Sequence, residues 1–168
     1  LLKNRGYYDF SREYIDFEVD TSYRPRQIAA LMNVRNPPRK TEHRVFRIDS
    51  ISFTTDASLN TRQAVSGQRT SKVFRNITFN YYRDEFSRKI LSQRVSLEKD
   101  SLFSREKTFF TQRQLANLDI FKFVNISYDT GHHTFTANIF TSPLDRYSWS
   151  NEFGVTVTQG FPGPYVTT

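Results

Sequence analysis

The sequence predicts an α+β fold, and three features lead to this class. Within residues 104–139 the apolar spacing changes from that of a helix to the two-residue period of strands. A similar order, a helix end followed by two strands, occurs in residues 2–34. The composition, with 16 Phe and 9 Tyr but only 6 Gly and 6 Pro, favours strands and aromatic packing. The 168 residues are enough for one domain or one and a half small ones.

Residues 1–38 predict the end of a helix and two strands. Gly6 stands where a left-handed residue would end the helix. Residues 13–20 alternate acidic and apolar side chains, and residues 27–34 form a second strand after a turn. A two-stranded hairpin is marginal alone, so we expect this segment to be the C-terminal part of a domain whose earlier elements precede Leu1.

Residues 39–147 predict a complete domain. A strand is expected over residues 43–53, with a phase slip near Asp49 that indicates a bulge or a bend. An insertion follows near residues 54–83. It consists of a polar loop and one extra strand over residues 73–82, which can pair with residues 43–53 as a long hairpin. A short helix over residues 84–93 and a connector over residues 95–104 complete this part.

Residues 104–118 predict a second helix. Ser104 can cap its first turn, where Glu106 favours the positive end of the helix. From Phe121 the period is two, which predicts a strand, a turn at residues 129–132 and a second strand. The side chains expected to face the core are Thr108, Thr111, Leu115, Leu118, Val124, Ile126, Tyr128, Phe135, Ala137 and Ile139.

The order of these elements resembles a POTRA (polypeptide-transport-associated) domain. Leu115, Leu118, Phe121, Val124 and Ile126 fit that family's Leu-x-x-Leu-x-x-Phe-x-x-Val-x-Ile pattern. The connector is similar to the family's Leu-Lys-Pro-Gly-(Asp/Glu)-x-(Tyr/Phe)-Ser segment, with Lys-Asp where Pro-Gly is usual. The resemblance implies tandem POTRA domains, each with two helices on a small mixed three-stranded sheet. The first copy is truncated, and the second carries the inserted loop and extra strand.

Residues 148–168 are expected to be a linker and the first strand of a β-barrel that lies outside this chain. Together with residues 140–147 they resemble the barrel junction of the BamA/TamA superfamily, most of all the TamA-like (TamL) branch of Bacteroidetes. The resemblance implies a scaffold on the periplasmic face of a Gram-negative outer membrane. Such a scaffold serves a barrel protein that assembles or translocates outer-membrane or surface proteins. The implied partners are unfolded outer-membrane polypeptides and a periplasmic or inner-membrane protein.

In that family, the first strand of the final hairpin is a sheet edge that pairs with an extended client. The resemblance therefore implies a client-binding edge formed by the backbone of one strand and a secondary edge in the first copy. The first consists of Phe121, Lys122, Phe123, Val124, Asn125, Ile126, Ser127 and Tyr128. The second consists of Tyr14, Ile15, Asp16, Phe17, Glu18 and Val19.

The sequence predicts no catalytic residue, metal site or cofactor, and hence no enzyme. The absence of Cys excludes disulfides and thiolate metal sites. His132 and His133 are adjacent in a predicted turn, where neighbouring side chains diverge. A different class remains open: the net charge of +7 and the strand aromatics are the ingredients of a basic, sheet-based nucleic-acid-binding module. Against it, the RRM aromatic-glycine signature is absent, and the first interpretation includes no nucleic-acid partner.

Overall fold

The computed structural model describes residues 1–24, 26–38, 41–57, 69–130, 135–144, 152–158 and 161–167. These residues form two α-helices, several strands and two short 3-10 helices, so the α+β class is confirmed. The first elements are η1 (Leu2–Asn4), η2 (Arg12–Tyr14), β1 (Ile15–Arg24) and β2 (Gln27–Val34). The central ones are β3 (Ser50–Thr54), β4 (Thr70–Phe74), β5 (Ile77–Tyr81), α1 (Arg88–Arg94), α2 (Arg105–Ala116), β6 (Phe121–Asp129) and β7 (Thr136–Pro143). The last are β8 (Glu152–Thr158) and β9 (Phe161–Thr167).

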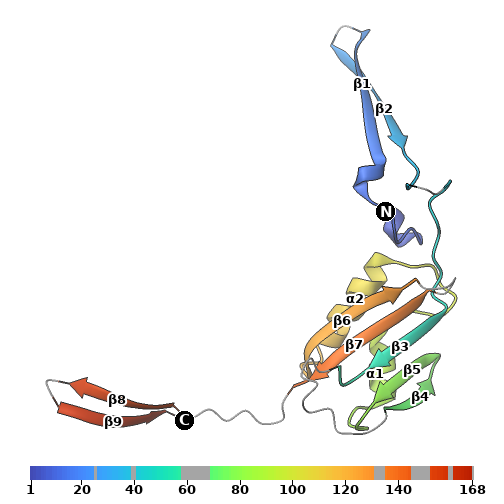
Figure 1. The fold of residues 1–168 in the computed structure, drawn as a ribbon. Helices are drawn as coiled ribbons and strands as arrows, with labels where there is room; N and C mark the ends of the chain where they lie inside the picture. Colours follow the sequence, from blue (N-terminus) through green and yellow to red (C-terminus); the bar gives the residue numbers. More distant parts are fainter. Residues whose placement is uncertain are drawn as a thin grey trace.

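The central sheet contains five strands in the order β4-β5-β3-β7-β6 (Figure 1). β6 and β7 are antiparallel, whereas β3 lies parallel to both of its neighbours, β7 and β5. The family resemblance implied a mixed sheet of three strands, whereas this mixed sheet contains β3, β7 and β6 together with β4 and β5. The sheet is larger than expected because the insertion adds two strands beside β3.

The prediction of one extra strand over residues 73–82 was wrong. This segment is a tight hairpin of β4 and β5, turned by Arg75 and Asn76 at φ of 49° and 61°. Two consecutive left-handed residues match the twist of a hairpin, but Arg-Asn is not the usual sequence signal for such a turn. β5 then pairs with β3 in parallel, through Ile51↔Ile77 to Thr54↔Asn80, and not as the antiparallel hairpin expected.

Two other boundaries differ from the sequence prediction. The strand expected over residues 43–53 is regular only from Ser50, after the predicted phase slip, and Arg47 makes an isolated bridge with Leu102. The helix expected over residues 84–93 begins at Arg88. Its Arg88 side chain donates to the carboxylate of Asp84 at 2.6 Å, which lowers the pKa of Asp84.

The core lies between the sheet and the helices, and the predicted stripe of α2 is confirmed. Thr111 and Leu115 are fully buried, while Thr108 and Leu118 are half-buried. The hydroxyl of Thr111 accepts a hydrogen bond from the backbone N–H of Ser96 at 3.0 Å, so its polar atom is satisfied. Phe135, Ala137 and Ile139 of the last strands are buried as predicted. Ser104 caps α2 by accepting from the N–H of Lys107.

The connector before α2 turns at Lys99 and Asp100, the two residues compared above with the Pro-Gly of the POTRA pattern. Asp100 has a φ of 62°, a left-handed conformation that Gly adopts more easily than other residues. Its N–H donates to the carbonyl of Ile48 at 2.7 Å, and the guanidinium of Arg47 donates to its carbonyl at 3.1 Å. The turn is therefore formed without Gly, and hydrogen bonds to the segment before β3 hold it.

Gly6 and Tyr8, near the start of the chain, pack on the central unit. Gly6, at a φ of 94°, donates its N–H to Phe103 and accepts from the N–H of Phe46, both at 2.9 Å. A Cβ at Gly6 would lie 2.7 Å from Val45 Cγ1, so no side chain fits this junction. The ring of Tyr8 inserts among aromatic residues of the core and lies 5.0 Å from the ring of Phe103. The start of the chain therefore contributes to the central core.

The β1–β2 hairpin confirms both strands expected in the first copy. Its register pairs Ile15, Phe17 and Val19 with Val34, Met32 and Ala30, and paired residues share a face. The β6–β7 register pairs Val124, Ile126 and Tyr128 with Thr141, Ile139 and Ala137 in the same order. The apolar face is half-buried or buried in the second hairpin. In the first hairpin it is largely exposed, with Phe17 at 64%.

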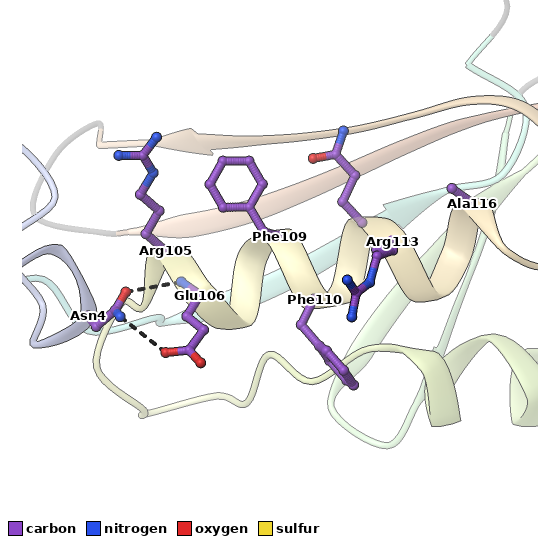
Figure 2. Close-up of a pocket in the computed structure, with 8 residues that line it drawn as sticks. Asn4, Arg105, Glu106, Phe109, Phe110, Arg113 and Ala116 are labelled. Atoms are coloured by element: carbon purple, nitrogen blue, oxygen red, sulfur yellow. Dashed lines mark hydrogen bonds between the residues drawn. The ribbon is translucent and has the colours of Figure 1, made fainter. Parts of the chain in front are cut away.

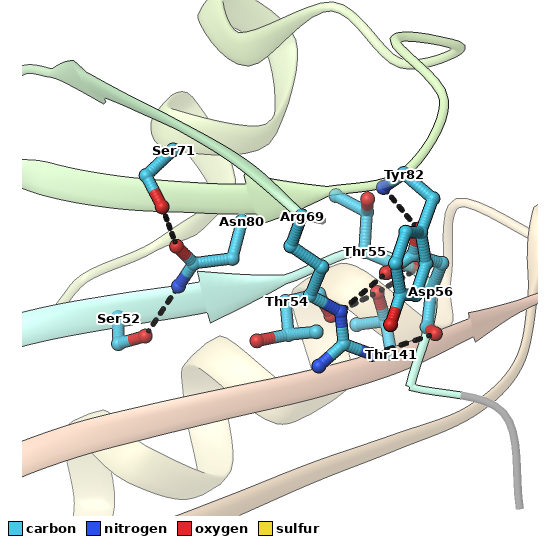
Figure 3. A network of polar contacts seen from close by, with 9 residues as sticks. All are labelled: Ser52, Thr54, Thr55, Asp56, Arg69, Ser71, Asn80, Tyr82 and Thr141. Carbon is cyan, nitrogen blue, oxygen red and sulfur yellow. Dashed lines mark hydrogen bonds and ion pairs between the residues drawn. The ribbon is translucent and has the colours of Figure 1, made fainter. Parts of the chain in front are cut away.

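A polar cluster joins the two sides of the insertion (Figure 3). The carboxylate of Asp56 accepts a hydrogen bond from the N–H of Tyr82 at 2.5 Å, and its other oxygen lies 3.5 Å from Nε of Arg69. The guanidinium of Arg69 stacks over the Tyr82 ring at 4.8 Å. This cluster holds the end of β3 beside the starts of β4 and of the segment after β5.

The last two strands, β8 and β9, pair antiparallel through Glu152↔Thr167 to Thr158↔Phe161. Both lie within residues 148–168, where a linker and one strand were expected, so the structure has one strand more than predicted. The predicted turn at residues 129–132 lies partly outside the described residues.

Candidate strand-pairing edge

β6 is an edge strand of the central sheet: β7 lies on one side, and none of the strands in the described ranges lies on the other. The direction of its backbone groups follows from the hydrogen bonds of β7. The carbonyls of Phe135 and Thr141 accept from the N–H groups of Asp49 and Ala57, which lie just before and just after β3. Alternate residues of β7 therefore face β3, and their partners on β6 cannot bond to them. These partners are Val124, Ile126 and Tyr128.

The N–H and C=O groups of Val124, Ile126 and Tyr128 thus point away from the sheet. Phe123, Asn125 and Ser127 direct theirs to β7. The register shifts between Phe121 and Phe123, so the ladder is irregular around Lys122. Of the eight residues predicted as the edge, three present outward backbone pairs in regular register.

The side chains of the same three residues belong to the core. Val124, Ile126 and Tyr128 are half-buried and pack against the buried cluster. The Tyr128 ring stacks on Phe135 at 4.9 Å, and its hydroxyl lies 2.6 Å from that of Thr108. Burial raises the pKa of Tyr128 to about 12, against the opposing effect of the Thr108 hydrogen bond. Side-chain packing therefore fixes the position of β6, while the outward N–H and C=O groups of these residues lie at the edge of the sheet.

One outward acceptor is already occupied. Nε2 of Gln112 on α2 donates to the carbonyl of Val124 at 2.9 Å. The sequence analysis did not identify Gln112, since its spacing shows only that it lies off the buried stripe. The contact between Thr108 and Tyr128 and that between Gln112 and Val124 run in opposite order along the two elements. α2 is therefore antiparallel to β6 and lies along its margin.

A groove of ≈ 730 Å³ follows the outer surface of α2 (Figure 2). Phe109 and Phe110 project from opposite sides of the helix and are 56% and 44% exposed. The guanidinium of Arg105 lies 5.2 Å from the centre of the Phe109 ring. The groove is lined by Asn4, Arg105, Glu106, Phe109, Phe110, Gln112, Arg113 and Ala116. Because Gln112 belongs both to the groove and to the contact with Val124, the groove is continuous with the β6 margin.

The secondary edge predicted in the first copy is shorter than expected. Tyr14 lies in η2, and its carbonyl accepts the N–H of Arg35 at 2.7 Å. From this bonded pair the alternation places Asp16 and Glu18 toward β2, and Ile15, Phe17 and Val19 outward. Ile15, Phe17 and Val19 therefore alternate along β1 in the same way as Val124, Ile126 and Tyr128 do along β6.

The opposite edge of the central sheet is β4. It is five residues long, against nine in β6, and carries Lys72 at its centre. Both edge strands carry a lysine, Lys72 in β4 and Lys122 in β6, so the difference lies in their length, and a short edge strand disfavours the addition of another strand. Of the two edges of this sheet, β6 is the better suited to pairing.

His43 has structural contacts: its Nε2 lies 3.0 Å from the carbonyl of Arg35, and its ring packs against Phe10 and Tyr14. His132 and His133 lie outside the described residues. Among the residues that the structure describes, no group of three His, Cys, Asp or Glu side chains could hold a metal ion. Neither α-helix in the described ranges has the length and apolar content needed to cross a membrane.

Comparison with known proteins finds no matching family model and no match among curated proteins.

Proposed function

We propose that this chain is a polypeptide-binding scaffold that captures extended clients by β-augmentation at β6. The observation that carries this proposal is the outward backbone of Val124, Ile126 and Tyr128 on a nine-residue edge strand. Main-chain pairing depends little on side chains, so such an edge suits a handler of many clients. No catalytic role is assigned to any residue.

We further propose that the central unit and the β1–β2 hairpin are POTRA domains of a BamA/TamA-superfamily protein. The second domain would be complete and the first partial. The support is the strand arrangement β3-β7-β6 with two helices, and the equivalent registers of the two hairpins. In this proposal the chain lies on the periplasmic face of the outer membrane, next to a barrel that assembles or translocates proteins. Its clients are unfolded outer-membrane polypeptides.

The edge is tested by two substitutions at one position. Ile126→Pro removes an outward N–H, and proline is tolerated on edge strands at such positions. Ile126→Ala removes the same side chain but keeps the N–H. We expect Ile126→Pro to weaken the binding of a fluorescein-labelled peptide of alternating valine and threonine about tenfold relative to Ile126→Ala. Circular dichroism confirms that both variants are folded, and fluorescence anisotropy measures binding. Equal affinities would exclude pairing at β6.

The nucleic-acid alternative is tested in the same assay with a random single-stranded oligonucleotide. Affinity for the oligonucleotide that falls steeply with salt, without any peptide binding, would favour a basic nucleic-acid-binding module. Our proposal expects peptide binding that changes little with salt, because main-chain pairing releases few counterions.

A further inference from the structure

The side of α2 that lies along the β6 margin carries a distinct set of residues. Arg105, Phe109, Gln112 and Ala116 are spaced by four, three and four positions, which places them on one stripe of the helix. Gln112 fixes the direction of this stripe, because its side chain contacts the carbonyl of Val124. Phe109 and Arg105 lie on the same side of the helix in Figure 2, stacked on each other.

A strand added to β6 would extend the sheet past this stripe. Its side chains would alternate between the two faces of the sheet, and those on the helix face would meet α2. The twelve residues of α2 span about 16–17 Å, a length that about five residues of an extended strand cover. Three alternating client side chains therefore fit along the stripe.

The chemistry of the stripe changes along its length. Ala116 and the exposed ring of Phe109 offer apolar contact, and Arg105 adds a positive charge at the other end. Among the described residues that line the groove, only Glu106 has a carboxylate; it accepts a hydrogen bond from Asn4 at 3.1 Å and projects to the other side of α2 from Arg105 (Figure 2). Arg105 would therefore attract an acidic group of the client, because no residue of the stripe is itself acidic.

We propose that Arg105, Phe109, Gln112 and Ala116 form a selectivity wall for the strand that pairs with β6. The wall fits an extended segment with apolar side chains at alternate positions and a carboxylate at the end facing Arg105. Arg105 lies toward the Tyr128 end of β6, because α2 is antiparallel to β6 and Thr108, one turn further along α2, contacts Tyr128. This inference rests on the proposed pairing at β6 and adds to it a preference for client side chains.

The probes are two labelled nonapeptides that are acetylated and amidated. One reads Asp-Thr-Val-Thr-Phe-Thr-Val-Thr-Asp, and the other has Lys at both ends. Acidic groups at both ends make the test independent of strand direction. With the 168-residue chain, we expect the Asp peptide to bind about tenfold more tightly than the Lys peptide in low salt.

Two pairs of variants separate the wall from the rest of the groove. Phe109→Ser is expected to lower the affinity for the Asp peptide about tenfold. Phe110→Ser removes another exposed ring, from the other side of α2, and is expected to change the affinity for the Asp peptide by less than about twofold. Arg105→Glu is expected to reverse the order of the two peptides, whereas Arg113→Glu preserves it.

The outcomes distinguish the two proposals. If Ile126→Pro binds about tenfold more weakly than Ile126→Ala but the Phe109 and Phe110 variants behave alike, the pairing at β6 is supported and the selectivity wall is wrong. If Arg105→Glu leaves the peptide preference unchanged, the charged end of the wall is wrong. If Ile126→Pro binds as Ile126→Ala does, the pairing at β6 fails, and the wall fails with it.

Discussion

Asn4 and Glu106 are joined by two hydrogen bonds although 102 positions separate them in the chain. The side-chain carbonyl of Asn4 accepts from the backbone N–H of Glu106 at 3.0 Å, and its amide donates to the Glu106 carboxylate at 3.1 Å. The first backbone N–H groups of a helix have no partner within the helix. Asn4 accepts a hydrogen bond from one of these N–H groups, that of Glu106, and Ser104 accepts from another, that of Lys107. The start of the chain therefore completes the cap of α2.

Replacing Asn4 with Ala is therefore expected to destabilise the central unit by about 1 kcal/mol, the usual cost of a lost helix cap. Urea denaturation followed by circular dichroism measures the change. Leu1→Ala is the control, because that side chain is 95% exposed. An unchanged free energy of unfolding in Asn4→Ala would show that the first residues do not support α2.

Leu115 is fully buried on the inner face of α2. Its replacement by Ala is expected to lower the free energy of unfolding by about 2–5 kcal/mol through the cavity that remains. Ile90→Ala on α1 is a suitable comparison, since Ile90 is 51% exposed and should cost much less. Similar losses in the two variants would contradict the core position of α2.

Tyr128 links stability to alkaline pH. Its pKa is about 12 in the folded protein, raised from 10.0 chiefly by burial, so the folded state holds the proton more tightly than the unfolded state. The stabilisation is complete below pH 10 and is lost as pH rises from 10 through 12. Over this pH range the free energy of unfolding is expected to fall by about 2–3 kcal/mol. Denaturation midpoints of Tyr128→Phe should lack this additional decline; parallel pH profiles would refute the assignment.

Gln112 occupies an outward acceptor that a client strand would use. Gln112→Met keeps the length of the side chain and frees the carbonyl of Val124. We expect peptide affinity to rise about fivefold, the equivalent of one hydrogen bond that no longer has to be exchanged. Gln114→Met is the control: Gln114 is on the same helix but contacts Arg94. Weaker binding in Gln112→Met would show that the amide assists the client.

Local patterns predicted most of the elements, because they depend on neighbouring residues. The cap at Ser104, the stripe through Leu115 and the alternation of β6 all follow from spacing within a few positions. The parallel pairing of β5 with β3 could not be predicted in this way, because side chains alternate along each strand identically in parallel and in antiparallel pairing. The turn at Arg75 and Asn76 has no glycine to mark it.

The site was predictable only in part for the same reason. The residues of the edge strand could be listed, but which backbone groups point outward depends on the bond of Thr141 to Ala57. The role of Gln112 depends on the position of α2 beside β6, and that of Tyr8 on a core built from distant segments. Such contacts exist only once the tertiary structure is formed.

The unequal edges of the central sheet also bear on self-association. Two copies that joined β6 to β6 would be related by a two-fold axis and would use up both receptive edges, so the assembly would close as a dimer. Through the central sheet alone, an open filament would require β6 of one copy to join β4 of the next, and β4 has only five residues. The short hairpin strand that lies beyond β3 and β5 thereby limits how far identical copies can polymerise through this sheet.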